Sequence, residues 1–277
     1  MIKSTLLEFH ETFQPETAYI SQILKLASEN YSGSKFDISE CSGIPTGQQK
    51  GKVEPHIRYA HYMGLINYTI EKGIYKLSLT PLGEEVFVQD PHLHEDLSCW
   101  LCHYGMTKRE SKALQWEYLT HVIHPGFAEK ISQDRMFSLA STWCDVAQDN
   151  MLKKVFSVVK NSYTEGFFQR LGFLNWDGTI EFNEHAEKFD LMFVYAYALL
   201  DSWETLFAEK QEITEFELKN EIGFGKIFGL NEDECNYVLD SLAFEGIITL
   251  NRQLFPATLI RTSHSSNVIT QIYSRLL

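Results

Sequence analysis

The pattern of apolar and polar positions is clearest between residues 36 and 88. Apolar positions recur at helical spacing over about 53–63, and Gly64 ends this helix because glycine tolerates the left-handed conformation. Residues 65–70 alternate as a strand, and residues 74–79 alternate as the returning strand of a hairpin. A short helix, a turn, a second helix and a hairpin in this order predict a winged helix-turn-helix module.

Such a module presents one helix to a DNA groove and its hairpin loop to the neighbouring backbone, but it also serves as a protein-binding scaffold. Both uses stay open from this stretch alone. The turn before the second helix is rich in amides and lysines, which suit phosphate oxygens and base edges; the alternative is a flexible polar loop. The residues predicted to contact DNA are Thr46, Gln48, Gln49, Lys50, Lys52, His56 and Arg58, with Lys72 and Lys76 on the hairpin.

Apolar residues at helical spacing predict further helices along most of the chain. These helices cover about 18–30, 93–104, 111–123, 133–146, 150–170 and, as a long apolar helix, 184–207. Glycine closes a helix and opens a hairpin in Met63-Gly-Leu-Ile, Leu171-Gly-Phe-Leu and Glu245-Gly-Ile-Ile, at spacings too unequal for a solenoid. We therefore expect a mainly α fold with small β-hairpin wings, in two or three winged-helix-like units joined by a helical connector. The second hairpin is alternatively a β-turn inside a helical domain.

These units divide the chain into three predicted domains. Residues 1–90 hold an N-terminal arm and the winged helix-turn-helix, residues 91–183 a helical connector that ends in a hairpin, and residues 184–277 a C-terminal winged-helix-like domain. No apolar run approaches the roughly 18 residues of a membrane span, and the first residues are too polar for a signal peptide. We therefore expect a cytoplasmic protein that makes no membrane contact.

The net charge of −13 is distributed unevenly. The segment from Asp177 to Glu245 has 17 acidic residues against four lysines, a balance of −13 that equals the charge of the whole chain. Such a segment repels DNA and suits a basic protein partner. DNA is therefore expected to lie near the cationic stretch that contains Lys50, Lys52 and Arg58.

Cys99-Trp-Leu-Cys-His103 matches the C-x-x-C-H pattern of covalent haem attachment. The same segment has the apolar pattern of a packed helix, in which free cysteine behaves as a small core residue. A zinc site with Cys99, Cys102 and His103 would need a fourth ligand, such as Cys144 or Cys235, and no spacing fixes one. The core interpretation is favoured, so we expect no cofactor and no metal.

No pattern in the chain anchors a catalytic assignment. Phosphate-loop, dinucleotide-binding, nucleophile-elbow and metalloprotease motifs are absent. His10 and Glu11 lie between phenylalanines, where a His–Glu pair more often brackets loop backbone than transfers protons. Gly223-Phe-Gly-Lys and Gly229 are rich in glycine, yet phenylalanines occupy positions where a phosphate needs room. We therefore expect a protein that is not an enzyme.

Several of these stretches occur together in one known family. The chain resembles domain of unknown function 4007 (DUF4007), an uncharacterised bacterial family, over residues 9–123. It departs from the family where Phe9 runs straight into His10 without an intervening glycine, and where the turn from Thr46 to Lys52 matches a glycine–lysine–asparagine turn only loosely. The shared stretches, in chain order, are Phe9-His-Glu-Thr-Phe, Pro45-Thr-Gly, His56-Ile-Arg-Tyr-Ala-His-Tyr-Met-Gly-Leu-Ile, Leu79-Thr-Pro-Leu-Gly-Glu and Leu97-Ser-Cys-Trp-Leu-Cys-His-Tyr.

The resemblance implies no known activity. It implies genes in phage-defence islands, often beside sulfur-transfer enzymes of DNA phosphorothioation or BREX-type systems. We therefore expect a non-catalytic protein that binds double-stranded DNA, plain or modified, within such a system, with a homodimer left open. The alternative is a protein–protein adaptor subunit that binds a basic partner through its acidic C-terminal half, without direct DNA contact.

Overall fold

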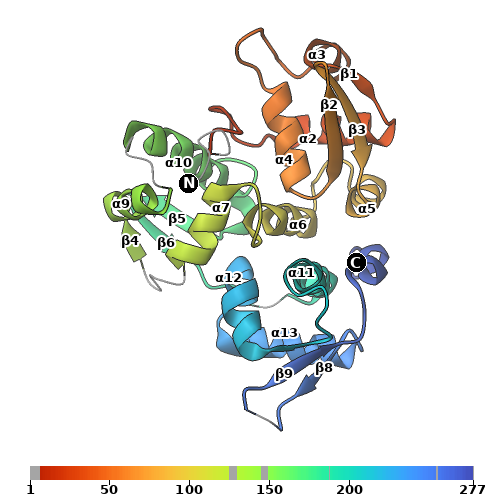
Figure 1. The fold of residues 1–277 in the computed structure, drawn as a ribbon, viewed down its shortest axis with the longest axis vertical. Coiled ribbons are helices and arrows are strands. Elements are labelled where there is room, and N and C mark those ends of the chain that lie inside the picture. Colours follow the sequence, from red (N-terminus) through yellow and green to blue (C-terminus); the bar gives the residue numbers. More distant parts are fainter. Residues whose placement is uncertain (1–6, 125–129, 145–148, 187, 254, 277) are drawn as a thin grey trace.

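The computed structural model describes residues 7–124, 130–144, 149–186, 188–253 and 255–276 (Figure 1). Helices predominate in this part of the chain, and the strands form three small antiparallel sheets of three strands each. The architecture is therefore mixed α and β. Each predicted hairpin gains a third strand, so the sheets are larger than the two-stranded wings expected from the sequence.

One order of elements occurs three times: a helix or its equivalent, a short strand, helices and a closing hairpin. The first repeat consists of α2 (Thr17–Ser28), β1 (Ser32–Ser34), α3 (Lys35–Ser42), α4 (Val53–Tyr62), β2 (Ile66–Glu71) and β3 (Ile74–Leu79). The short strand β1 pairs with the returning strand β3, so the sheet has the order β1-β3-β2.

The middle repeat consists of α7 (Leu114–Tyr118) with the π-helical turn η1 (Leu119–Ile123), β4 (Lys130–Ser132), α9 (Gln133–Cys144), α10 (Asp149–Thr164), β5 (Leu174–Asp177) and β6 (Thr179–Phe182). The last repeat consists of α11 (Met192–Leu206), β7 (Glu212–Thr214), η4 (Glu217–Ile222), α12 (Phe224–Phe228), α13 (Glu232–Phe244), β8 (Ile248–Asn251) and β9 (Thr258–Arg261). The strand orders β4-β6-β5 and β7-β9-β8 repeat that of the first sheet. The alternative of a lone β-turn near residue 177 is therefore wrong.

Helix α6 (Asp96–Thr107) lies between the three repeats (Figure 1). Every side chain from Leu97 to Thr107 is buried, and the helix packs against α7, α11 and α12. Asp90 fixes the segment just before it, because its carboxylate accepts the N–H groups of His94 and Glu95 at 2.8 and 2.9 Å. The three repeats therefore share one core, with α6 at its centre.

The predicted helices and hairpins are confirmed, with local differences. The helix expected over 150–170 ends at Thr164. The stretch Leu79-Thr-Pro-Leu-Gly-Glu starts an additional helix, α5 (Pro81–Gln89), since the Thr80 hydroxyl accepts the N–H of Gly83 at 2.9 Å. The long apolar helix starts at Met192 rather than near residue 184. The stretch before it is held in another conformation, where the N–H of His185 donates to the carbonyl of Gly229 at 2.8 Å.

Residues 7–16, which we call the N-terminal arm, pack across α4. The ring of Phe9 lies edge-on to Tyr59 and Tyr62, with centroid distances of 5.1 and 4.8 Å. The Tyr59 hydroxyl donates to the carbonyl of Phe13 at 2.9 Å. The arm is therefore part of the core rather than an appendage.

We expect Phe9→Ala to lower the free energy of unfolding by about 3–5 kcal/mol, because a buried ring leaves a cavity when it is removed. Urea denaturation followed by circular dichroism measures this change. Phe244→Ala is the matched control, since Phe244 is 90% exposed and its loss should change stability by no more than about 0.5 kcal/mol. Equal effects of the two substitutions would show that the arm does not pack on α4.

Candidate nucleic-acid interface

The turn before α4 carries the first group of predicted DNA contacts. Gln48, Gln49 and Lys50 are exposed, and Thr46 is half-buried. Lys35 fixes the turn, because its ammonium group donates to the backbone carbonyl of Gln48 at 3.2 Å. The structure thus brings four of the predicted residues together on one surface loop.

Lys72 and Lys76 lie on the hairpin of the first repeat, and both are exposed. Lys72 occupies the turn with a φ of 52°. Lys76 pairs with Glu71 at 2.8 Å on the open surface, where such a pair is weak and yields to a stronger partner. Both side chains can therefore reach a ligand beside the hairpin.

Lys52 has a partner inside the protein. Its ammonium nitrogen lies 2.7 Å from a carboxylate oxygen of Glu16, and this carboxylate raises the pKa of Lys52. The same nitrogen lies 5.2 Å from the centre of the Tyr19 ring. A DNA phosphate would have to displace Glu16 to bind Lys52.

The prediction that His56 contacts DNA is wrong. Its side chain is completely buried, and both ring nitrogens are used. Nε2 accepts the N–H of Glu16 at 3.1 Å, so Nδ1 carries the proton and donates to the carbonyl of Lys52 at 2.6 Å. Burial lowers the pKa of His56 to about 4, because a charged imidazolium would lose its hydration. His56 is a neutral core residue that joins α4 to the N-terminal arm.

Arg58 also faces the arm, where its guanidinium donates to the carbonyl of Phe9 at 2.9 Å. No residue of α4, from Val53 to Tyr62, is fully exposed. The helix therefore offers little free surface to a DNA groove. The arm covers the part of its polar face that contains His56 and Arg58.

The helices that precede the three hairpins, α4, α10 and α13, differ in the side chains that they expose. The exposed face of α13 carries acidic and aromatic residues, and its carboxylates repel phosphate. Its fully exposed residues are Glu232, Asp233, Tyr237, Asp240 and Phe244.

Helix α10 exposes a cationic face instead. Lys153, Lys154 and Lys160 lie on it at helical spacing, and no acidic residue occurs between Asn150 and Thr164. Its opposite face, which contains Leu152, Val155, Phe156 and Val159, is buried. Polar groups share the lysine face: Asn150, Ser157 and Asn161. This combination of cations and short amide or hydroxyl side chains is typical of a helix that contacts DNA phosphates and base edges.

The lysines of α10 are absent from the residues predicted from the sequence, although their signal is present there. The spacing is helical: Ser157 follows Lys153 by four residues and Lys154 by three, and Lys160 follows Ser157 by three. Outside the acidic segment the charges cancel when summed, and the sum conceals one local cationic face. The charge along each predicted helix face would have revealed it.

The Cys99-Trp-Leu-Cys-His103 motif lies inside α6 and belongs to the core. Both thiols are buried, and burial raises the pKa of Cys99 to about 12. His103 donates from Nε2 to the carbonyl of Ile227 and accepts the hydroxyl of Tyr163 at Nδ1, each at 2.8 Å. The ring therefore has no nitrogen left for a metal.

Two further features follow from the side chains that the structure describes. No three histidine, cysteine or acidic side chains among them gather as ligands of one metal ion. In the same part of the chain, no helix combines the length and the apolar composition that crossing a membrane requires.

Comparison with known proteins gives one family and one fold. The family model described as "Protein of unknown function (DUF4007)" matches residues 8–273. This range extends well beyond residues 9–123, which contain the stretches shared with the family. A "Magnesium ion-bound SspB crystal structure" and an "SspB crystal structure" have TM-scores of 0.78 and 0.77, each at 17% identity, over 96% of this chain and 87% of the other. At this identity the likeness shows the fold alone. No curated protein sequence matches the chain.

We expect His56 to make stability depend on pH. Its pKa is about 4 in the folded state and about 6.5 when unfolded, so its contribution is complete above about pH 6.5 and is lost as the pH falls toward 4. Between about pH 7 and pH 5 this loss amounts to roughly 2 kcal/mol. Urea denaturation of the wild type and of His56→Gln at both pH values measures it. The wild type should lose more stability than the variant, which keeps the same buried histidines elsewhere. Parallel losses would mean that His56 is solvated in the folded protein.

Proposed function

The chain belongs to the DUF4007 family, and from this membership we propose that it is a non-catalytic DNA-binding protein of a bacterial phage-defence or DNA-modification system. The family resemblance supports the biological setting, since it implies genes beside DNA phosphorothioation or BREX-type systems. The likeness to SspB supports the fold. The DNA contact itself is supported by the surface of α10.

We interpret each repeat as a winged helix: a helix, a short strand, two helices (three helical segments in the last repeat) and a hairpin whose last strand pairs with the short one. We assign α4, α10 and α13 to the helix that such modules present to DNA. The arm covers α4, and acids cover α13. The middle repeat is therefore the one whose presented helix is both exposed and cationic.

On this proposal the lysines of α10 bind phosphates, and the amides between them reach base edges. Each lysine that neutralises one phosphate releases condensed counterions. Each such contact therefore adds about −0.9 to the slope of the logarithm of the binding constant against the logarithm of the salt concentration. Lys154 and Lys160 are the two lysines used to test the proposal. The exposed turn and hairpin of the first repeat, with Lys50 and Lys72, form a second cationic edge.

The magnesium ion named for one SspB structure is that protein's ligand. In the described part of this chain, carboxylates, histidines and cysteines do not converge in groups of three or more.

We expect the double substitution Lys154→Ala and Lys160→Ala to weaken DNA binding uniformly across sequences. The slope of the logarithm of the binding constant against the logarithm of salt should fall by about 1.8, since two phosphate contacts are lost. Gel shifts with plain and phosphorothioated duplexes of one sequence, over a salt series from about 50 to 200 mM, measure both quantities.

The double substitution Lys50→Ala and Lys72→Ala is the matched control, because it removes the same charge from the first repeat. A loss confined to this control would place the contact on the turn and hairpin and overturn the assignment to α10. Wild-type protein that binds neither duplex would overturn DNA binding altogether.

The adaptor function is the second candidate, and the exposed face of α13 favours it. Asp233, Tyr237, Asp240 and Phe244 follow one another at intervals of three and four residues, so they form one stripe. Tyr237 is 57% exposed and Phe244 is 90% exposed, which is costly for aromatic side chains without a partner. Aromatic anchors with a carboxylate rim suit a basic protein surface.

We expect Tyr237→Ala with Phe244→Ala to abolish co-purification with a basic defence protein encoded beside this chain, in nuclease-treated extract at moderate salt. Removing two central aromatic anchors typically costs an interface several kcal/mol. Phe216→Ala is the control, because Phe216 is 62% exposed and precedes η4, away from the stripe. Co-purification that survives the double substitution, or that requires DNA, would rule out this surface.

A further inference from the structure

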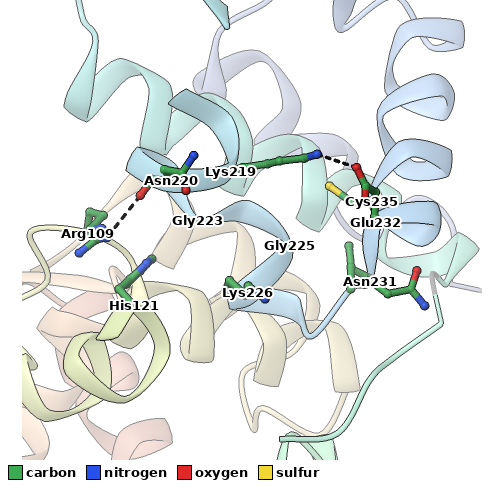
Figure 2. A pocket seen from close by; sticks show the side chains of 11 residues that line it. Arg109, His121, Lys219, Asn220, Gly223, Gly225, Lys226, Asn231, Glu232 and Cys235 are labelled. Carbon is green, nitrogen blue, oxygen red and sulfur yellow. Dashed lines mark hydrogen bonds and ion pairs between the residues drawn. The ribbon is translucent and has the colours of Figure 1, made fainter. Parts of the chain in front are cut away.

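A cavity of about 570 Å³ opens where α6 and η1 meet the last repeat (Figure 2). Arg109 and His121 line it on one side, and Lys219 and Lys226 on the other. This volume lies in the range of small-molecule sites. Because the lining comes from two distant parts of the sequence, the cavity exists only in the folded chain.

The phenylalanines of the glycine-rich stretch do not fill this cavity, contrary to the expectation from sequence. Phe224 and Phe228 are buried, and the ring of Phe228 lies edge-on to Tyr195 with a centroid distance of 4.9 Å. Gly223 and Gly225 line the cavity in their place (Figure 2). A Cβ atom on Gly223 would lie 2.6 Å from Nδ1 of His121, so glycine is required here for the backbone to approach the His121 ring. The cavity volume of about 570 Å³ provides the room that a phosphate needs.

Most polar groups of the cavity wall already have partners. Lys219 pairs with Glu215 at 2.9 Å and with Glu232 at 2.8 Å, so two carboxylates more than balance its charge. His121 donates from Nε2 to the carbonyl of Thr107 at 2.8 Å, and burial lowers its pKa to about 3. Lys219 and His121 therefore contribute little net positive charge to the cavity.

Arg109 and Lys226 differ from these groups. Neither forms an ion pair among the residues that the structure describes. Arg109 donates to the carbonyls of Asn220 and Glu221 at 3.3 and 3.2 Å, which holds the guanidinium in place without neutralising it. Glu117 forms no ion pair with Arg109. Burial raises the pKa of the Glu117 carboxyl, and the more distant Arg109 guanidinium offsets only part of this rise. Arg109 and Lys226 thus both line the cavity, and no carboxylate of the described residues forms an ion pair with either of them.

We propose that this cavity binds a doubly charged oxyanion: a phosphate group, either free or carried by a metabolite of nucleotide size. The guanidinium and the ammonium group supply charge-assisted hydrogen bonds, which are the strong ones in a partly enclosed site. The volume leaves room for more than the phosphate itself.

A DNA strand is disfavoured as the occupant. Glu232 lines the cavity, and the acidic face of α13 continues from it through Asp233 and Asp240. A small anion in the cavity lies near only a few of these carboxylates. A polyanion such as DNA would extend along the acidic face and be repelled over its whole length. The inference is therefore independent of the lysine face of α10.

Isothermal titration of the full chain with inorganic phosphate and, separately, with ADP tests the proposal. Both should bind, and Arg109→Gln and Lys226→Gln should each weaken binding by about tenfold or more, as expected for the loss of one charge-assisted hydrogen bond. Lys210→Gln is the control, since this exposed lysine pairs with Glu217 and lies outside the cavity wall. Circular dichroism melts verify that the variants fold. Lys226→Gln decides the test if Arg109→Gln fails to fold.

The outcomes separate the sources of the ligand. Equal affinities would identify the bare oxyanion, and tighter binding of ADP would identify a phosphorylated metabolite; both support the proposal. No heat with either probe up to about 10 mM would overturn it, as would unchanged affinity in Lys226→Gln. If Lys226→Gln instead weakens only DNA binding, the cavity belongs to a DNA surface and the proposal fails. None of these results depends on Lys154 or Lys160.

Discussion

The structure depends on the burial of α6 on all sides. A helix without a solvent face has to satisfy its polar side chains inside the core, because each unpaired buried group costs about 1–3 kcal/mol. The segment after α5 and the middle and last repeats contribute to this. Ser98 donates to Asp90 at 2.6 Å, His103 links Tyr163 of the middle repeat to Ile227 of the last one, and Tyr104 donates to Asp201 at 2.6 Å. These bonds tie α6 to the segment after α5 and to the middle and last repeats.

The shared core also decides what each repeat can expose. In the first repeat, α4 packs against the arm: Arg58 of α4 donates to the carbonyl of Phe9, and the Phe9 ring contacts Tyr59. Polar side chains of α4 are therefore used for packing. The other two repeats leave α10 and α13 at the surface with opposite charge. One element order thus gives a buried helix, a cationic helix and an acidic helix. The three helices occupy equivalent places in the repeats, but their exposed side chains differ in charge and chemistry.

Local elements were predictable because their signals are local: apolar spacing gives α2, α9 and α13, and glycine after a helix gives each hairpin. The strands β1, β4 and β7 were not, since three residues such as Ser-Gly-Ser have no period and form only by pairing with a distant strand. The burial of His56 was also beyond the sequence. Its helix has the polar face of an exposed helix, and only an arm some 40 residues earlier in the chain covers that face. The lysines of α10, in contrast, were readable and were concealed by summing charge over whole segments.

Net charge is a poor guide to the partners of this chain for a related reason. Many acids of the last repeat already have cations beside them, as in the pairs of Lys219 with Glu215 and Glu232 and of Arg252 with Asp240. Beyond about 10 Å, salt at 0.1 M screens most of what is left. If DNA binds as proposed, a phosphate at α10 would respond chiefly to the lysines nearest to it. The acidic face of α13 would disfavour orientations of a long duplex that bring it toward the last repeat. The negative charge would then set the direction in which DNA leaves the protein and would have little effect on whether it binds.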